Sequence, residues 1–195
     1  MMQELDSLRE LLWMLVKNPR TGVLFALLTI ASITDYRTYK IPNWLTAGGI
    51  IFGLVYSVFV PFSRDFGFLW ALGGMMLGFI VMLPCYALRI MGAGDVKLMA
   101  MVGAFLGVDD CLHAVIYSFI VGGIAALGFA LFNRAMIRML QNVKDITQSM
   151  MFAVVGGFKP DVRITASQSI GKMPYGICIS VATAGYVVAK QLGFA

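Results

Sequence analysis

The sequence predicts an all-α fold, a polytopic membrane helix bundle of about six transmembrane helices with an amphipathic helix on the cytoplasmic surface. Of its 195 residues, 59% are hydrophobic and 13% are charged, and the mean hydropathy is +0.84. Average soluble domains are about 45–50% apolar and about 25% charged. Because part of any soluble fold's exterior must be polar, a soluble domain of this length could not bury so much apolar surface. The composition therefore excludes a water-soluble enzyme, a disordered tail and a fibrous protein.

A third observation is the division of the chain into apolar segments. A membrane-spanning helix needs roughly 20 mostly apolar residues, and six segments come close to that length: 21–35, 44–60, 67–88, 95–108, 111–132 and 174–190. The first and fourth are short, and each has an aspartate at one end. Such polar ends are tolerated where they face protein or a water-filled cavity. We expect residues 1–195 to form a single integral membrane domain.

Two segments outside these spans have a different character. Residues 1–20 form an amphipathic N-terminal segment that carries acidic residues and too short an apolar run for a cleavable signal peptide. Within the loop 133–173, apolar residues of the stretch 133–155 recur at helical spacing opposite charged ones. This pattern predicts an interfacial helix lying on the cytoplasmic membrane surface.

The distribution of Lys and Arg orients the bundle. If the loops 36–43, 89–94 and 133–173 share one side, that side is rich in basic residues, whereas the opposite loops hold only Arg64 and Lys190 besides the mixed-charge N-terminal segment. Cytoplasmic loops carry an excess of Lys and Arg, so we expect the first three loops to be cytoplasmic. Topology in a lipid membrane explains the net charge of +5 better than nucleic-acid binding does.

Two aspartates lie at membrane depth. Asp35 closes the first span and Asp95 opens the fourth, and the predicted topology places both at cytoplasmic helix ends. Placing an ionisable group within a membrane costs free energy, so such a residue is considered first as a candidate functional residue. Two carboxyl groups in close contact share a proton, so the ionised one can deprotonate water while the protonated one polarises a peptide carbonyl. This is the chemistry of aspartic proteases, and it requires no metal or other cofactor.

A purely structural explanation competes with this hypothesis, because each aspartate could cap a helix or pair with a nearby Lys or Arg. A helix N-terminus favours an acid, which suits Asp95 but not Asp35, since Asp35 lies at a helix C-terminus. Gly92 and Gly94 precede Asp95. Lacking Cβ atoms, they would let an extended peptide approach closely, although a lone G-x-G can also simply break a helix.

Other polar residues near the aspartates have simpler expected roles. Arg37 and Lys97 could steer or balance the acid pair. Each lies two residues from its aspartate and off its helical face, so cytoplasmic anchoring is the favoured role. Asn43 is expected to cap the second span. Three cysteines lie far apart with no C-x-x-C pair, so we expect no zinc site and no disulfide framework: Cys85, Cys111 and Cys178.

The sequence around both aspartates resembles the type IV prepilin peptidases, membrane aspartic proteases named for a G-x-G-D motif. Residues 35–43 read D-Y-R-T-Y-K-I-P-N, which is similar to the family's D-x-R-x-x-x-I-P-N. Residues 92–98 read G-A-G-D-V-K-L, similar to G-x-G-D-x-K-L, and Pro174-Tyr175-Gly176 is similar to the family's P-Y-G element. All three occur in the family's order on one predicted side, and together they cover the core from about residue 22 to residue 190.

The resemblance implies a leader peptidase that cuts prepilin or pseudopilin precursors, a leader joined to an apolar helix, at the cytoplasmic face of the bacterial inner membrane. Asp35 and Asp95 would be its catalytic pair. Larger members carry a cysteine-rich domain and also methylate the new N-terminus. Without a C-x-x-C pair, this chain resembles the short, peptidase-only branch that serves Flp-type (tight-adherence) pili, and we expect no methyltransferase activity. The matching motif residues would support the active site: Gly92, Gly94, Lys97, Arg37, Pro174, Tyr175 and Gly176.

Other readings of the same residues stay open at this stage. A small transporter or proton channel could use the same intramembrane aspartates, although the repeated halves common in transporters are not found between 1–100 and 101–195. A non-catalytic scaffold of a pilus or secretion machine would not need the two acids. Presenilin-like and signal-peptide-peptidase-like proteases share the G-x-G-D motif but normally lack the I-P-N and P-Y-G context. The sequence specifies neither the precursor nor the oligomeric state.

Overall fold

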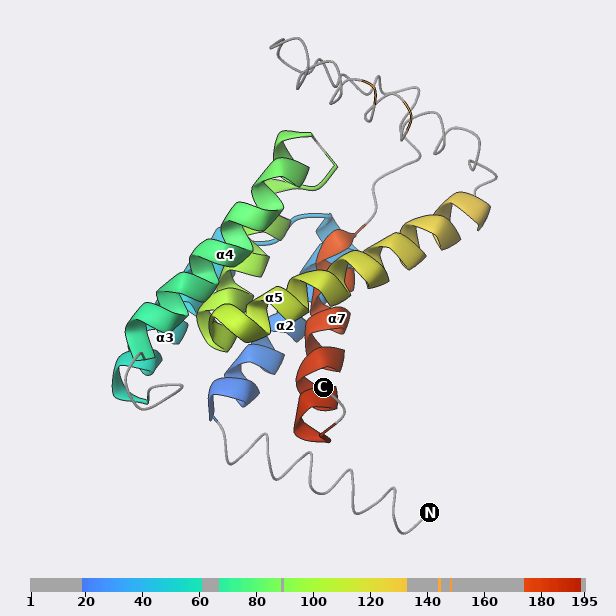
Figure 1. Ribbon diagram of the computed structural model, residues 1–195. Helices are drawn as coiled ribbons and strands as arrows, with labels where there is room; N and C mark the ends of the chain where they lie inside the picture. The colour runs from blue at the N-terminus through green and yellow to red at the C-terminus, as the bar shows by residue number, and fades with distance from the viewer. Residues whose placement is uncertain are drawn as a thin grey trace.

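The structure, a computed structural model, describes residues 19–60, 67–88, 90–132 and 174–193, together with the single positions 144 and 148. The elements in these ranges are all helices, as Figure 1 shows: α2 (Pro19–Thr38), α3 (Asn43–Phe59), α4 (Gly67–Ala87), α5 (Ala93–Phe132) and α7 (Tyr175–Gln191). The predicted all-α class is therefore confirmed. Apart from the first residues of α2 and the two single positions, the amphipathic segments predicted within 1–20 and 133–173 lie outside the described residues.

The helices follow the predicted apolar segments closely. Four segments correspond to α2, α3, α4 and α7, and the remaining two, 95–108 and 111–132, are the two halves of α5. The break in α5 falls at Gly107, whose φ of 81° and ψ of −175° are non-helical. A Cβ at Gly107 would lie 2.5 Å from Cδ1 of Trp70. Glycine therefore serves both the positive φ and the close packing, and the two halves run in different directions (Figure 1).

Two of the described helical stretches are long and apolar enough to cross a membrane, judged by length and composition: Gly67–Ala87 and Ala93–Gly128. Asn43–Phe59 is apolar but shorter. Large apolar side chains are exposed on α3, α4 and the second half of α5, among them Ile51, Val55, Phe59, Leu69, Ile80, Ile116, Ile120 and Ile124. Lipid tails would cover such a surface, whereas soluble monomers rarely expose large apolar patches. That each of the six segments spans the bilayer stays a prediction.

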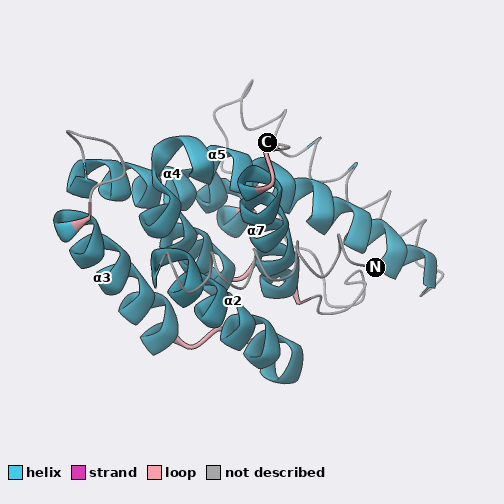
Figure 2. Cartoon of the chain, turned by 90° about the horizontal axis from the view of Figure 1, so that it is seen from below, coloured by secondary structure: helices cyan, strands magenta, loops and turns pink. Residues whose placement is uncertain are grey.

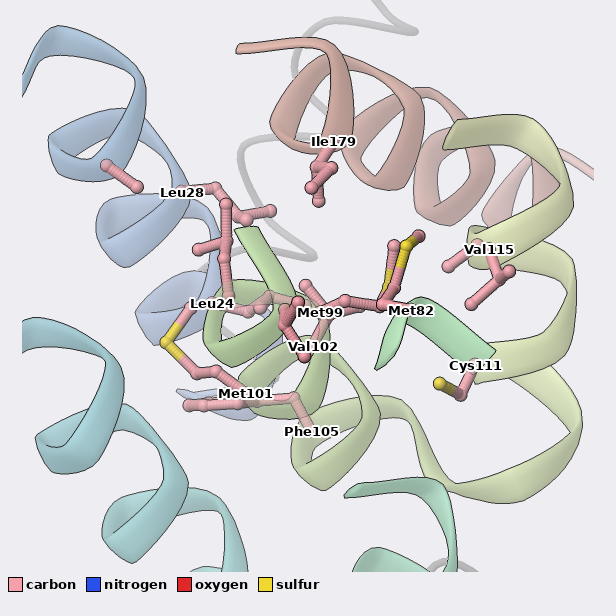
Figure 3. Close-up of a cluster of buried hydrophobic side chains, with 14 of the residues drawn as sticks. Leu24, Leu28, Met82, Met99, Met101, Val102, Phe105, Cys111, Val115 and Ile179 are labelled. Atoms are coloured by element: carbon pink, nitrogen blue, oxygen red, sulfur yellow. The ribbon is translucent and has the colours of Figure 1, made fainter. Parts of the chain in front are cut away.

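The first half of α5 is the centre of the bundle. α5 contacts each of the other four described helices, and Figure 1 shows α4 and α7 on either side of it. Side chains from three helices pack on this half in Figure 3: Leu24 and Leu28 from α2, Met82 from α4, and Ile179 from α7. The buried apolar residues of the first half of α5 are Val96, Leu98, Met99, Ala100, Met101, Val102, Ala104 and Phe105. The second half extends beyond the packed helices (Figures 1 and 2).

Glycines allow α4 and α5 to pack backbone against backbone. Gly74 and Gly78 are four residues apart and so share one face of α4, as in other close-packed membrane helices. A Cβ on Gly74 would lie 2.3 Å from the carbonyl oxygen of Gly103, and a Cβ on Gly103 would lie 2.1 Å from that of Gly74. A Cβ on Gly78 would lie 2.6 Å from the carbonyl oxygen of Met99. These opposing atoms are backbone and cannot rotate away.

Polar contacts join helix ends at the opposite end of the bundle from Asp35 and Asp95. Arg20, at the start of α2, donates to the carbonyl oxygen of Val60 at 2.6 Å, just past the end of α3. Near the end of α7, Tyr186 and Lys190 donate to Asp110 at 2.8 and 2.6 Å. These contacts hold α2 against α3 and α7 against α5 at this end, and they show that Asp110 has a structural role.

We expect Gly103→Val to destabilise the bundle. The new side chain overlaps the backbone of Gly74, so α4 and α5 must move apart, at a cost of about 1–3 kcal/mol. Thermal unfolding of the detergent-solubilised protein measures the effect. The control is Gly123→Ala in the second half of α5, because a Cβ there meets nothing within 4 Å. Equal unfolding temperatures for the two variants would contradict close backbone packing of α4 and α5.

Candidate active site

The three sequence motifs meet at one end of the bundle. Asp35 lies in the last turn of α2, Asp95 in the first turn of α5, and Tyr175 begins α7. Both aspartates are buried, with only 5% of Asp35 and 8% of Asp95 exposed. The two carboxyl groups are near enough to interact electrostatically. Residues 60 positions apart in the sequence are thus brought into one buried acidic site.

Asp35 is held by the N-terminus of another helix. The backbone N–H of Gly176 donates to Oδ2 of Asp35 at 2.8 Å, and the backbone amide of Ile177 also interacts with this carboxylate. Pro174 is the N-cap residue of α7 and makes no side-chain capping hydrogen bond. The Asp35 carboxylate takes the place of such a cap, and the positive end of the α7 dipole favours its negative charge.

Gly176 has to be small because Asp35 lies against it. A Cβ at Gly176 would lie 2.8 Å from Oδ2 of Asp35 and 2.9 Å from Cδ1 of Ile41. Any larger residue would push the carboxylate away from the helix end that holds it. The glycine of the P-Y-G element is therefore explained by close approach rather than by an unusual backbone conformation.

Asp95 caps its own helix. Its Oδ2 accepts a hydrogen bond from the backbone N–H of Gly92 at 3.0 Å, and its own N–H donates to the carbonyl oxygen of Gly92 at 3.1 Å. This reciprocal pair is a variant of the capping box, with the acid at the third helical position. The structural role considered for Asp95 is thus present, and Gly94, one residue before it, packs against Ile41.

Each carboxyl group uses Oδ2 to bind a helix end. Among the described residues, none donates a hydrogen bond to Oδ1 of Asp35 or Asp95, and no Lys or Arg in those ranges forms an ion pair with either. Pairing with a basic residue therefore does not explain these two acids within this part of the chain. One oxygen of each group is left for other partners such as water.

Lys97 and Asn43 bind each other. The Lys97 ammonium donates to Oδ1 of Asn43 at 2.9 Å, and both side chains are exposed. The predicted capping role of Asn43 is wrong, because the N-cap of α3 is Pro42 and no side-chain capping bond is made there. Asn43 instead begins the helix and accepts from Lys97. Arg37 is exposed at the end of α2.

Tyr175 and Cys178 are further neighbours of the acids. Tyr175 lies near Asp95, and its ring lies beside Gly122, where a Cβ would be 3.7 Å from Cε1. Cys178 is buried and lies near both aspartates. Within the described ranges, no group of three His, Cys, Asp or Glu residues could hold a metal ion.

Comparison with known proteins now assigns the family. The family model of the type IV leader peptidases matches residues 22–127, more than half of the chain, and both aspartates lie inside the match. This chain belongs to the type IV leader peptidase family. As a leader peptidase with long apolar helices, it is a membrane protein that acts on prepilin-type substrates. No curated protein and no solved structure matches the chain.

The matched part of this leader peptidase ends before α7. The structure nevertheless places Gly176 on Asp35, so the last helix contributes directly to the acidic site. Ile41, which is not among the predicted site residues, packs between Gly94 and Gly176. Its position in the I-P-N motif was the available signal, but an isoleucine in a loop looks like an ordinary apolar residue.

We expect Gly176→Ala to lower leader cleavage about 10²-fold, because a displacement of the carboxylate by about 1 Å is enough for that loss. Cleavage of a prepilin-type substrate is measured in membranes that contain equal amounts of each variant. The control is Gly185→Ala on the same helix, where a Cβ meets nothing within 4 Å. Wild-type cleavage by Gly176→Ala would show that the contact between α7 and Asp35 is dispensable.

Proposed function

We propose that this leader peptidase is an aspartic endopeptidase that cleaves Flp-like type IV prepilins or pseudopilins at the cytoplasmic face of the bacterial inner membrane. The observation that carries the proposal is the buried acid pair, in which each carboxyl group binds a helix N-terminus through one oxygen. Family membership supplies the leader peptidase activity. The proposal adds the mechanism, the type of precursor and the side of the membrane.

In the proposed mechanism a water molecule lies between Asp35 and Asp95. The ionised carboxylate takes a proton from this water as the water oxygen attacks the scissile carbonyl carbon. The protonated carboxyl group donates a hydrogen bond to the carbonyl oxygen and stabilises the charge that develops there. The C–N bond then breaks as a proton passes to the leaving amine. Neither a metal nor a covalent enzyme intermediate takes part.

The hydrogen bonds favour one assignment of the two roles. Asp35 interacts with two backbone amides at the start of α7, Gly176 and Ile177, whereas one backbone amide, that of Gly92, donates to Asp95. Hydrogen bonds donated to a carboxylate favour its charged form. We therefore assign the general base to Asp35 and the protonated partner to Asp95.

The position of the pair suits a precursor with a leader and an apolar helix. The ends of α2, α5 and α7 that carry the site adjoin the loops 36–43, 89–94 and 133–173, which are rich in Lys and Arg. The positive-inside rule puts such loops in the cytoplasm. A precursor helix lying in the bilayer would then present its leader junction at the depth of the two acids. We propose that residues 1–195 form one such peptidase domain.

We expect Asp35→Asn and Asp95→Asn each to lower cleavage by about 10²–10⁴-fold, the usual contribution of a general acid or base. Co-expression with a candidate prepilin and the size shift on a gel measure the effect, with membrane accumulation checked by immunoblot. The control is Asp109→Asn, which changes an exposed acid outside the acidic site.

Full processing of the prepilin by Asp35→Asn or by Asp95→Asn would refute the two-acid mechanism. The purified protein in liposomes provides a second readout. Proton flux that depends on both aspartates, in the absence of peptide cleavage, would favour a transport function over the proposed one.

A further inference from the structure

We propose that residues 41–43 form a positioning element that sets how the two catalytic carboxyl groups face each other. In this element Ile41 is a spacer between the starts of α5 and α7, and Asn43 binds the start of α5 through Lys97. The inference rests on the proposed aspartic mechanism, because it concerns the geometry of the same acid pair.

Ile41 touches the backbone beside both acids. A Cβ on Gly94, the residue before Asp95, would lie 3.2 Å from Cβ of Ile41. A Cβ on Gly176, whose N–H binds Asp35, would lie 2.9 Å from Cδ1 of Ile41. Ile41 also packs against the buried core. The isoleucine side chain therefore fills the gap between the two helix starts, and its size sets how closely they approach.

Asn43 supplies a second link to the helix of Asp95. The Lys97 ammonium donates to Asn43 at 2.9 Å across 54 positions of sequence. A hydrogen bond from a charged donor is stronger than a neutral one. Because both side chains are exposed, removing this bond leaves the buried core unchanged. The bond is thus suited to fixing orientation rather than to supporting the fold.

The segment is also tied to Asp35 itself. The N–H of Tyr39 donates to the carbonyl oxygen of Asp35 at 2.8 Å and so ends α2. Tyr39 has a φ of +52°, in the left-handed region that non-glycine residues seldom adopt. Such a conformation persists where the surrounding contacts hold it, and at a helix end it turns the chain out of the helix. The turn leads directly to Ile41 and Asn43.

The first test is a double-mutant cycle with Asn43→Leu, Lys97→Met and the combined variant. We expect each single change to lower kcat about tenfold with KM nearly unchanged, because orientation of the acids is lost while substrate binding is not. Since both changes remove the same bond, the combined variant should be no worse than either one. Asn43→Asp keeps the acceptor and should retain wild-type kcat.

A different outcome would assign Lys97 to the substrate. If Lys97→Met raises KM, Asn43→Leu leaves both constants unchanged, and the two effects multiply, Lys97 acts on the substrate without Asn43 and the proposal is wrong. If Lys97→Met accumulates poorly in the membrane, kcat of Asn43→Leu is compared with kcat of Asn43→Asp instead. A lower kcat for Asn43→Leu alone supports the proposal, and wild-type kcat for both variants contradicts it.

The second test examines the spacer through suppression. Gly94→Ala should lower kcat, because the new methyl group pushes Ile41 towards Gly176. Ile41→Val removes Cδ1 and gives the side chain room, so it should restore part of the lost kcat in the Gly94→Ala background. The control is Ile50→Val, which shortens another partly buried isoleucine of the same core. Failure of Ile41→Val to restore activity, or equal restoration by Ile50→Val, would overturn the spacer role.

The Asp→Asn variants separate failure of this inference from failure of the proposed function. If either Asp→Asn variant cleaves normally, the aspartic mechanism itself is wrong. If both are inactive while Asn43→Leu, Lys97→Met and Gly94→Ala keep wild-type kcat, only the positioning role of residues 41–43 is wrong.

Discussion

The hydrogen bond from Gly176 to Asp35 is the interaction on which the acidic site depends. A carboxyl group that is only 5% exposed is costly unless it has hydrogen-bond partners. The C-terminus of α2 cannot supply them, because its unpaired groups are carbonyls and its dipole repels an acid. The N-terminus of α7 supplies them from 141 residues away. Docking of the last helix is therefore a condition for burying Asp35.

The same physical solution is used at Asp95, with the helix's own N-terminus as the partner. Two helix N-termini thus converge on one buried point, and their positive ends offset the mutual repulsion of two acids. This convergence requires close approach of backbones. It explains why Gly176 faces Asp35 and Ile41, and why Gly94 faces Ile41. Gly94 and Gly176 are needed for the space they leave.

The sequence predicted the helices well, because runs of about 20 apolar residues are a direct consequence of bilayer thickness. The cap at Asp95 was also predictable, since Gly92 and Asp95 lie only three positions apart in the chain. The partner of Asp35 was not, because a contact between α2 and α7 exists only after the helices pack. The residue type of Asn43 predicts a helix cap, whereas the structure has Pro42 at the N-cap position and the Asn43 side chain bound to Lys97.

The two acids are supported unequally by the fold. Asp95 begins the central helix, which contacts all the other described helices and is held to α4 through glycine backbone contacts. Asp35 ends α2, which packs Leu24 and Leu28 into the same core and whose last turn is held by the N–H of Gly176 and by the turn through Tyr39. The core sets how α2 lies against α5, whereas the contacts at the helix ends set how the two carboxyl groups face each other. In the proposed mechanism, the local contacts at Gly176 and residues 41–43 therefore adjust the geometry on which hydrolysis by two acids relies.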